Sequence, residues 1–152
     1  MSGPQSSGTD DPYRLERFVT AQDSAGTYPR ALAELRAGRK TSHWMWFIFP
    51  QVAGLGLSHM AQRYAVSGLA EARAYLGHPV LGPRLRECTG AVAAGQESSA
   101  DRILGPVDAM KLRSCMTLFA AAAAPPEPSF DAVLTRYFDG QPDQATLVRL
   151  SS

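Results

Sequence analysis

The chain has 152 residues, of which 45% are apolar and 19% charged, and its formal net charge is +1. A chain of this length is about the size of one domain, and its apolar fraction excludes a protein that stays disordered as a whole. A net charge so near zero gives no overall field for nucleic acid or an anionic membrane, so anion recognition must come from local clusters. We therefore expect one folded domain that does not bind nucleic acid in bulk.

The features that report on cellular location favour the cytoplasm. Cys88 and Cys115 lie far apart and lack the C-x-x-C spacing, so two buried, reduced thiols are expected. Residues 1–10 contain neither a basic nor an apolar run, and we predict a disordered tail ahead of a single helical domain at 11–150. The longest apolar-rich stretch, 44–57, is shorter than the ~20 residues that cross a bilayer, so no association with a membrane is expected.

Short apolar-periodic segments separated by glycine and proline follow this tail. Apolar residues at helical spacing predict helices at 12–23 and 27–37, the second ended by a glycine. Residues 43–49 fit a short helical turn that Pro50 must end, with a buried strand as the competing interpretation. A serine cap then predicts a helix over 58–68.

The second half of the chain continues in the same pattern. The expected helices there cover residues 69–76, 80–94, a short segment ending at Gly105, 107–122, 129–138 and a last short segment around 147–150. The helix over 107–122 is expected to be central, with Leu112, Cys115, Met116 and Phe119 on its core side. No alternating strand pattern of convincing length appears. The predicted fold is all-α, an irregular orthogonal bundle of about seven to nine short helices in one domain.

The most informative stretch runs from Arg39 to Gln51, where two cations and a histidine directly precede a run of aromatic residues. Aromatic faces beside positive groups suit a flat, phosphate-bearing ligand, through stacking, cation–π contact and charge-assisted hydrogen bonds. The candidate ligand-binding residues here are Arg39, Lys40, His43, Trp44, Trp46 and Gln51. The alternative is that the aromatic residues fill the core, and Met45, Phe47 and Phe49 are interpreted in that way.

A second candidate group lies on the predicted central helix. Asp108 and Lys111 share one face, and inside a pocket they could orient a water molecule and bind an anion, so they are the candidate catalytic residues. An ordinary ion pair in the first helical turn is the alternative. Arg84 is a further candidate for holding a phosphate, with a solvated helix face as its alternative. The histidines are not at metal-binding spacings, so neither a metal nor a cofactor is expected.

The run from Gly38 to Gln51, GRKTSHWMWFIFPQ, followed by Gly54-Leu-Gly56, resembles an uncharacterised bacterial family built on a domain of unknown function. The resemblance continues through residues 78–85 and 105–119, and it covers about residues 11–150. It implies an all-α fold and a bacterial cytoplasmic protein. Members of that family are sometimes labelled calpastatin, a name that implies nothing here because that inhibitor is a disordered repeat protein.

More distantly, the central helix with Lys111 and Met116 is similar to the NADAR domains, which are associated with ADP-ribose, with other N-ribosyl compounds and with N-glycosidic hydrolysis. This resemblance implies a hydrolase acting on the N-glycosidic bond of a nucleotide or ADP-ribose derivative. Asp108 would orient water, Lys40, Arg84 and Lys111 would hold phosphate, and a tryptophan would stack on the base.

The partner expected on this hypothesis is a phosphorylated, ribose-containing small molecule. A non-catalytic module that binds a small molecule or a protein is the alternative, with the aromatic run exposed as an anchor patch. A third possibility is that Asp108 and Lys111 only pin helices together. The sequence leaves the oligomeric state unknown.

Overall fold

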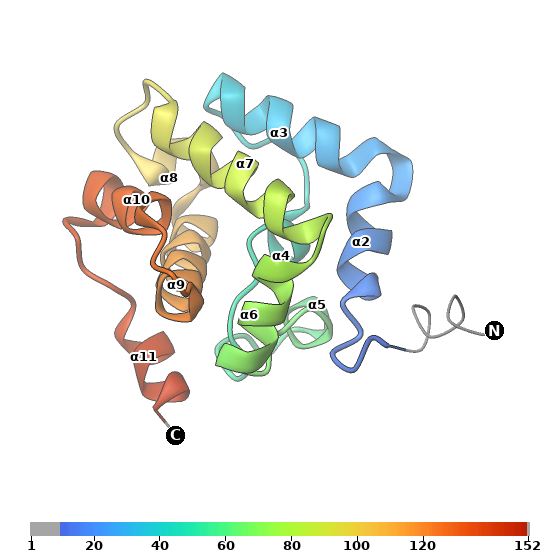
Figure 1. Ribbon diagram of the computed structural model, residues 1–152. Coiled ribbons are helices and arrows are strands. Elements are labelled where there is room, and N and C mark those ends of the chain that lie inside the picture. The colour runs from blue at the N-terminus through green and yellow to red at the C-terminus, as the bar shows by residue number, and fades with distance from the viewer. Residues whose placement is uncertain (1–9, 152) are drawn as a thin grey trace.

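Helices make up most of the chain in the computed structural model, which describes residues 10–151 (Figure 1). The elements are α2 (Glu16–Asp23), a 3-10 turn η1 (Ser24–Gly26), α3 (Thr27–Ala37), α4 (Met45–Ile48), α5 (His59–Arg63), α6 (Leu69–Gly77), α7 (Leu81–Ala94), α8 (Ala100–Leu104), α9 (Pro106–Ala122), α10 (Pro128–Phe138) and α11 (Gln144–Leu150). Within residues 10–151 no strand forms, and one isolated bridge joins Val52 to Val66. The predicted all-α fold is confirmed.

The predicted tail at residues 1–10 lies outside the described residues, apart from Asp10. Among the residues that are described, no helix is both long and apolar enough to cross a membrane.

Several helix ends lie where local sequence signals predict them. The Oγ of Ser58 accepts a hydrogen bond from the N–H of Ala61 at 3.1 Å and caps α5. Gly38 ends α3 with a φ of 75°, a left-handed conformation that glycine adopts without steric cost. Pro106 begins α9, where a missing N–H is no disadvantage. These boundaries are therefore set by the chemistry of a few adjacent residues.

Two predicted helices are shorter than expected. The first begins about one turn late, at Glu16, because Arg14 takes a left-handed turn with a φ of 52°. The helix expected over 58–68 ends at Arg63, because Val66 leaves the helix to form the bridge with Val52. In both places a tertiary or turn conformation overrides a sequence that is compatible with a helix.

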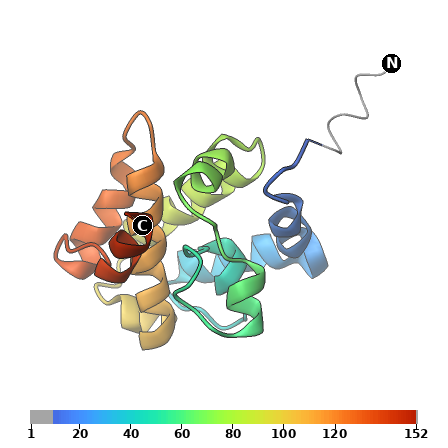
Figure 2. The ribbon, with the colours of Figure 1, turned by 90° about the horizontal axis from the view of Figure 1, so that it is seen from below.

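Helix α9 lies in the middle of the molecule and contacts α6, α8, α10 and α11 (Figures 1 and 2). Its predicted core residues Leu112, Cys115, Met116 and Phe119 are completely buried, as expected. Full burial of a Leu, Met or Phe side chain contributes roughly 1.5–3 kcal/mol, so this face of α9 is a main source of stability. Cys88 is also buried, and both thiols are unpaired, as predicted.

Residues 43–49 contain the helical turn α4, which excludes the strand interpretation. Met45, Phe47 and Phe49 are all buried, as predicted. The short helix directs these side chains against α2 and the aromatic core, where the Phe47 ring lies 5.3 Å from the ring of Tyr64. The aromatic run is therefore not an exposed anchor patch for a partner protein, and this one form of the binding-module alternative is wrong.

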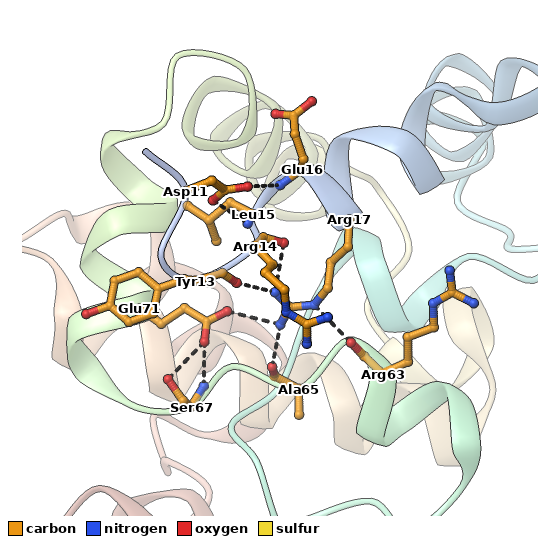
Figure 3. A network of polar contacts seen from close by, with 10 residues as sticks. All are labelled: Asp11, Tyr13, Arg14, Leu15, Glu16, Arg17, Arg63, Ala65, Ser67 and Glu71. Atoms are coloured by element: carbon orange, nitrogen blue, oxygen red, sulfur yellow. Dashed lines mark hydrogen bonds and ion pairs between the residues drawn. The ribbon is translucent and has the colours of Figure 1, made fainter. Parts of the chain in front are cut away.

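An arginine whose side chain is 13% exposed joins the start of α2 to the segments around α5 and α6 (Figure 3). All five N–H groups of the Arg17 guanidinium have an acceptor, namely the carbonyl oxygens of Tyr13, Arg14, Arg63 and Ala65 and the carboxylate of Glu71. The Nη2 of Arg17 lies 3.1 Å from Oε2 of Glu71, a residue that is only 3% exposed. The second oxygen of Glu71 accepts hydrogen bonds from the N–H and the hydroxyl of Ser67. We call these residues the Arg17 network.

Candidate functional site

Two lysines and one aspartate meet where the segment after α3 approaches α9. The Nζ of Lys40 lies 3.0 Å from Oδ2 of Asp108, and the Nζ of Lys111 lies 3.4 Å from Oδ1 of the same carboxylate. The side chain of Lys40 is 9% exposed, against 23% for Lys111. The ion pair expected on α9 therefore forms, but a second lysine from a distant segment joins it, so the three charges sum to +1.

Each of these lysines also lies against a tryptophan ring. The Nζ of Lys40 is 5.1 Å from the ring centroid of Trp44, and the Nζ of Lys111 is 5.2 Å from that of Trp46. Both distances are within the range of about 6 Å for a cation–π contact. The chain has only two lysines and two tryptophans, and all four meet here. Together with Asp108 we call them the lysine cluster.

The two tryptophans have different environments. Trp44 is completely buried, and its indole N–H donates to Oε1 of Glu34 at 2.9 Å. Because no face of Trp44 is accessible, it cannot stack on a ligand, and its prediction as a ligand-stacking residue is wrong. Trp46, on α4, is partly exposed and is the tryptophan that can meet a ligand.

The carboxylate of Glu34, on α3, holds the segment that carries Lys40 and Trp44. It accepts hydrogen bonds from the N–H groups of Thr41 and Ser42, from the Ser42 hydroxyl and from the indole of Trp44. Burial alone would raise the pKa of this carboxyl, but the hydrogen bonds outweigh burial and lower its pKa to about 2. Glu34 therefore organises this segment as an ionised acceptor.

Lys111 also lines a cleft of about 290 Å³ between α9, the loop after α4 and the start of α11. The polar part of its lining comes from Gln51, Lys111, Ser114 and Asp143, and the apolar part from Leu55, Val107 and Met110. Val107 and Met110 are each 68% exposed at its rim. We call this hollow the Lys111 cleft. It combines one cation, one carboxylate and an amide with exposed apolar side chains.

The carboxylate of Asp143 has two separate surroundings. Its Oδ2 accepts hydrogen bonds from the N–H and the hydroxyl of Thr146, at 3.0 and 2.6 Å, and so caps α11. Its Oδ1 has no hydrogen-bond donor among residues 10–151. One oxygen of Asp143 is therefore available to a molecule in the cleft.

Three of the predicted site residues neither join the lysine cluster nor line the Lys111 cleft. Arg84, on α7, lies 2.8 Å from the carboxylate of Asp23, and its guanidinium stacks 4.7 Å from the ring centroid of Tyr28. Its predicted grouping with the lysines is therefore wrong. Arg39 and His43 are exposed, and within the described chain their side chains make no polar contact. The residues that do converge are those on or next to α4 and α9.

Sequence reasoning missed Glu34 and Asp143. Asp143 carries a readable signal as the cap of a last helix, but nothing in the sequence brings that helix beside Lys111. Glu34 sits within α3 and resembles any solvated glutamate, because its four donors come from residues that fold back on it.

Comparisons with known proteins identify relatives whose descriptions state no activity. A family profile described as a protein of unknown function (DUF1810) matches residues 12–150. A comparison with curated proteins finds no match. Among solved structures, the chain is similar to the conserved hypothetical protein Rv1873 from Mycobacterium tuberculosis, with 51% identity, 93% of this chain and 99% of that chain covered, and a TM-score of 0.89. The predicted membership of an uncharacterised family is confirmed, and the likeness to NADAR domains stays a prediction.

Proposed function

The chain belongs to the DUF1810 family of proteins of unknown function, and we propose that it binds a small, phosphorylated, ribose-containing compound in the Lys111 cleft. The observation that carries this proposal is the position of Lys111, whose ammonium contacts Asp108 and the Trp46 ring while its side chain lines the cleft. A lysine ammonium has three donors, and one carboxylate oxygen leaves donors for a phosphate. The proposal includes a cytoplasmic location.

The other cleft residues match the remaining parts of such a ligand. The unused Oδ1 of Asp143 can accept hydrogen bonds from ribose hydroxyls, and the Gln51 amide adds both a donor and an acceptor. Val107 and Met110 supply apolar surface for a base. Pockets for small ligands usually measure about 300–1,000 Å³, so a cleft of about 290 Å³ favours a mononucleotide-sized ligand over a buried dinucleotide.

The choice of lysine supports an anion site. All other strongly basic residues of the chain are arginine, whereas the two positions of the lysine cluster use lysine. An ammonium is a compact point charge on a flexible stem, and it fits beside a tryptophan ring and a carboxylate without the fixed fork of a guanidinium. A phosphate needs only such a point charge, since bidentate geometry is optional for its recognition.

Thermal-shift and calorimetric titration with AMP, ADP-ribose and ribose 5-phosphate test this proposal. At a ligand concentration of about 100 times the Kd, binding adds about 2.7 kcal/mol to the stability of the folded state, which is a readily measured rise in Tm. Lys111→Ala should abolish that rise. Arg30→Ala is a matched control, because Arg30 is an exposed cation whose guanidinium donates, among the described residues, only to the carbonyl of Ala25. No stabilisation by any of the three compounds would refute the proposal.

A second candidate function is hydrolysis of an N-glycosidic bond in the same class of compound. The observation that favours it is the carboxylate of Asp108, which lies between the ammonium groups of Lys40 and Lys111, and Lys111 lines the cleft. The Asp108 side chain is 19% exposed. An ionised carboxylate next to a bound ribose can stabilise the positive charge of an oxocarbenium-like centre. Binding remains the first proposal because both oxygens of Asp108 already face lysines.

Incubation with NAD and with nucleosides, followed by chromatography of the released base, tests the second candidate. Asp108→Asn keeps the size of the side chain and removes its charge, so it should abolish base release while ligand binding persists. Base release that survives this substitution would exclude Asp108 as the catalytic carboxylate. Binding without any base release would leave the protein as a binding module.

A further inference from the structure

One wall of the Lys111 cleft is the loop after α4, and the C-terminal helix α11 contacts this loop. The loop supplies Gln51, Leu55 and Gly56 to the cleft, and α9 supplies the opposite wall. At its start the loop is tied to the chain ahead of α6, since the N–H of Ala53 donates to the carbonyl of Val66 at 2.7 Å. In the part of the chain that the structure describes, residues 54–57 form no backbone hydrogen bond to another segment, so the support of the loop there comes from a side chain.

That support is Arg149 on α11. Its Nε donates to the carbonyl of Ala53 at 3.2 Å, and its guanidinium occupies the space where a side chain at Gly54 would be. A Cβ built on Gly54 would lie 1.4 Å from Nη2 of Arg149, and the φ of 95° at Gly54 is itself a conformation that favours glycine. The guanidinium of Arg149 therefore packs directly against the backbone of Gly54, where no other residue leaves room for it.

Helix α11 is fixed to the opposite wall as well. The N–H of Asp143 donates to the hydroxyl of Thr117 on α9 at 2.8 Å, and Thr146 is completely buried. Asp143 and Ala145 line the cleft themselves. Figure 1 shows α11 beside α9 at the end of the chain. Helix α11 thus contacts α9 at its start and the loop near its end, so it connects the two walls of the Lys111 cleft.

We propose that Arg149 is a positioning residue that sets the width of the Lys111 cleft and thereby selects its ligand by size. The inference rests on the proposed function of the cleft. With Arg149 in place, the loop stays close to α9, and a phosphoribosyl group touches both walls. Without the contact of Arg149 with Ala53 and Gly54, the loop moves away from α9. The smaller ligand then loses contacts with one wall, and a ligand that carries a base gains room.

The test compares the Kd values of ribose 5-phosphate and AMP, by calorimetry, in the wild-type protein and in Arg149→Ala. We expect the ratio of the two Kd values to shift at least about fivefold in favour of AMP, a size discrimination typical of pocket walls. Arg30→Ala removes another exposed arginine whose guanidinium donates to a backbone carbonyl, and it should leave the ratio unchanged. A merely structural role of Arg149 would lower Tm without changing this ratio.

Gly54→Ala is the second variant. Its new methyl group would displace the guanidinium, so it should shift the ratio in the same direction as Arg149→Ala. If the wild type and Arg30→Ala bind both probes through Lys111 but the ratio in Arg149→Ala stays within about twofold of the wild-type value, the inference fails while the proposed function stands. If the wild type binds neither probe, the inference fails, and the proposed function fails with it when ADP-ribose does not bind either.

Discussion

The Arg17 network and the lysine cluster both bring charges together between helices, but they differ in what is left unpaired. Around Arg17 every guanidinium N–H has an acceptor, and both oxygens of Glu71 are hydrogen-bonded. In the lysine cluster, Lys40 and Lys111 share one carboxylate, and no backbone carbonyl of residues 10–151 accepts a hydrogen bond from either ammonium.

This difference separates a structural site from a candidate binding site. Buried polar groups cost free energy unless they are paired, so a saturated network is stable by itself and has nothing to offer a ligand. A cation with unused donors at the edge of a cleft is still solvated and can exchange water for a phosphate. Mutations in the Arg17 network should therefore mainly lower the free energy of unfolding, whereas mutations in the lysine cluster should mainly weaken ligand binding.

The largest effect is expected from Arg17→Ala. It leaves the buried carboxylate of Glu71 without its cation and several carbonyl oxygens without donors, so the free energy of unfolding should fall by about 3–5 kcal/mol. Urea denaturation measures this loss. Arg39→Ala, which removes an exposed arginine whose side chain makes no polar contact within residues 10–151, should change stability by less than about 0.5 kcal/mol. A loss below about 1 kcal/mol in Arg17→Ala would show that the network is not a structural node.

A smaller loss, about 2 kcal/mol near neutral pH, is expected from Glu34→Gln, since the amide weakens charge-assisted hydrogen bonds. The pKa of Glu34 in the folded state is about 2, below its ordinary 4.5, so its ionised form stabilises the fold above pH 4.5. That stabilisation is lost as the pH falls from 4.5 toward 2. Urea titrations across this range should show the wild type and Glu34→Gln converging, and parallel curves would contradict the assignment.

The smallest effect on stability is expected from Lys111→Ala. Lys111 and Asp108 form a partly exposed ion pair three residues apart on a helix, and Asp108 keeps Lys40 as a partner when Lys111 is removed. Such a pair contributes only about 0.2–0.5 kcal/mol, so the free energy of unfolding should change by about that amount. Lys111→Ala should nevertheless abolish ligand-induced stabilisation. This is the clearest contrast with Arg17→Ala, whose main effect is on the free energy of unfolding. If Lys111→Ala instead destabilised the protein as much as Arg17→Ala, the lysine cluster would be a second structural node.

Much of the fold was predictable because its signals are local. Ser58, Gly38 and Pro106 mark helix ends through groups within four residues of themselves, and the spacing of the apolar residues on α9 identified its buried face correctly. The same local reasoning failed at Arg14, where a left-handed turn delays the first helix. It also failed for the helix that ends at Arg63.

The site was predictable only in part. The types of residue in the run from Arg39 to Gln51 indicated a cation–aromatic site, and four of its candidates lie in the lysine cluster or line the cleft. The sequence did not distinguish Trp44 from Trp46, because α4 is a single turn whose direction depends on what it packs against. It also grouped Arg84 with the lysines, although that side chain pairs with Asp23.

By itself, the sequence determined the helices, the buried face of α9 and the kinds of side chain available for a site, since these depend on neighbours within a few turns. Only the tertiary structure decided that Lys40 meets Asp108. That contact requires the segment after α3 to dock on α8, where the N–H of Lys40 donates to the carbonyl of Ile103 at 2.7 Å. It also decided that Arg149 supports a loop almost one hundred residues earlier in the chain. Such contacts depend on how whole helices pack, and no local pattern encodes them.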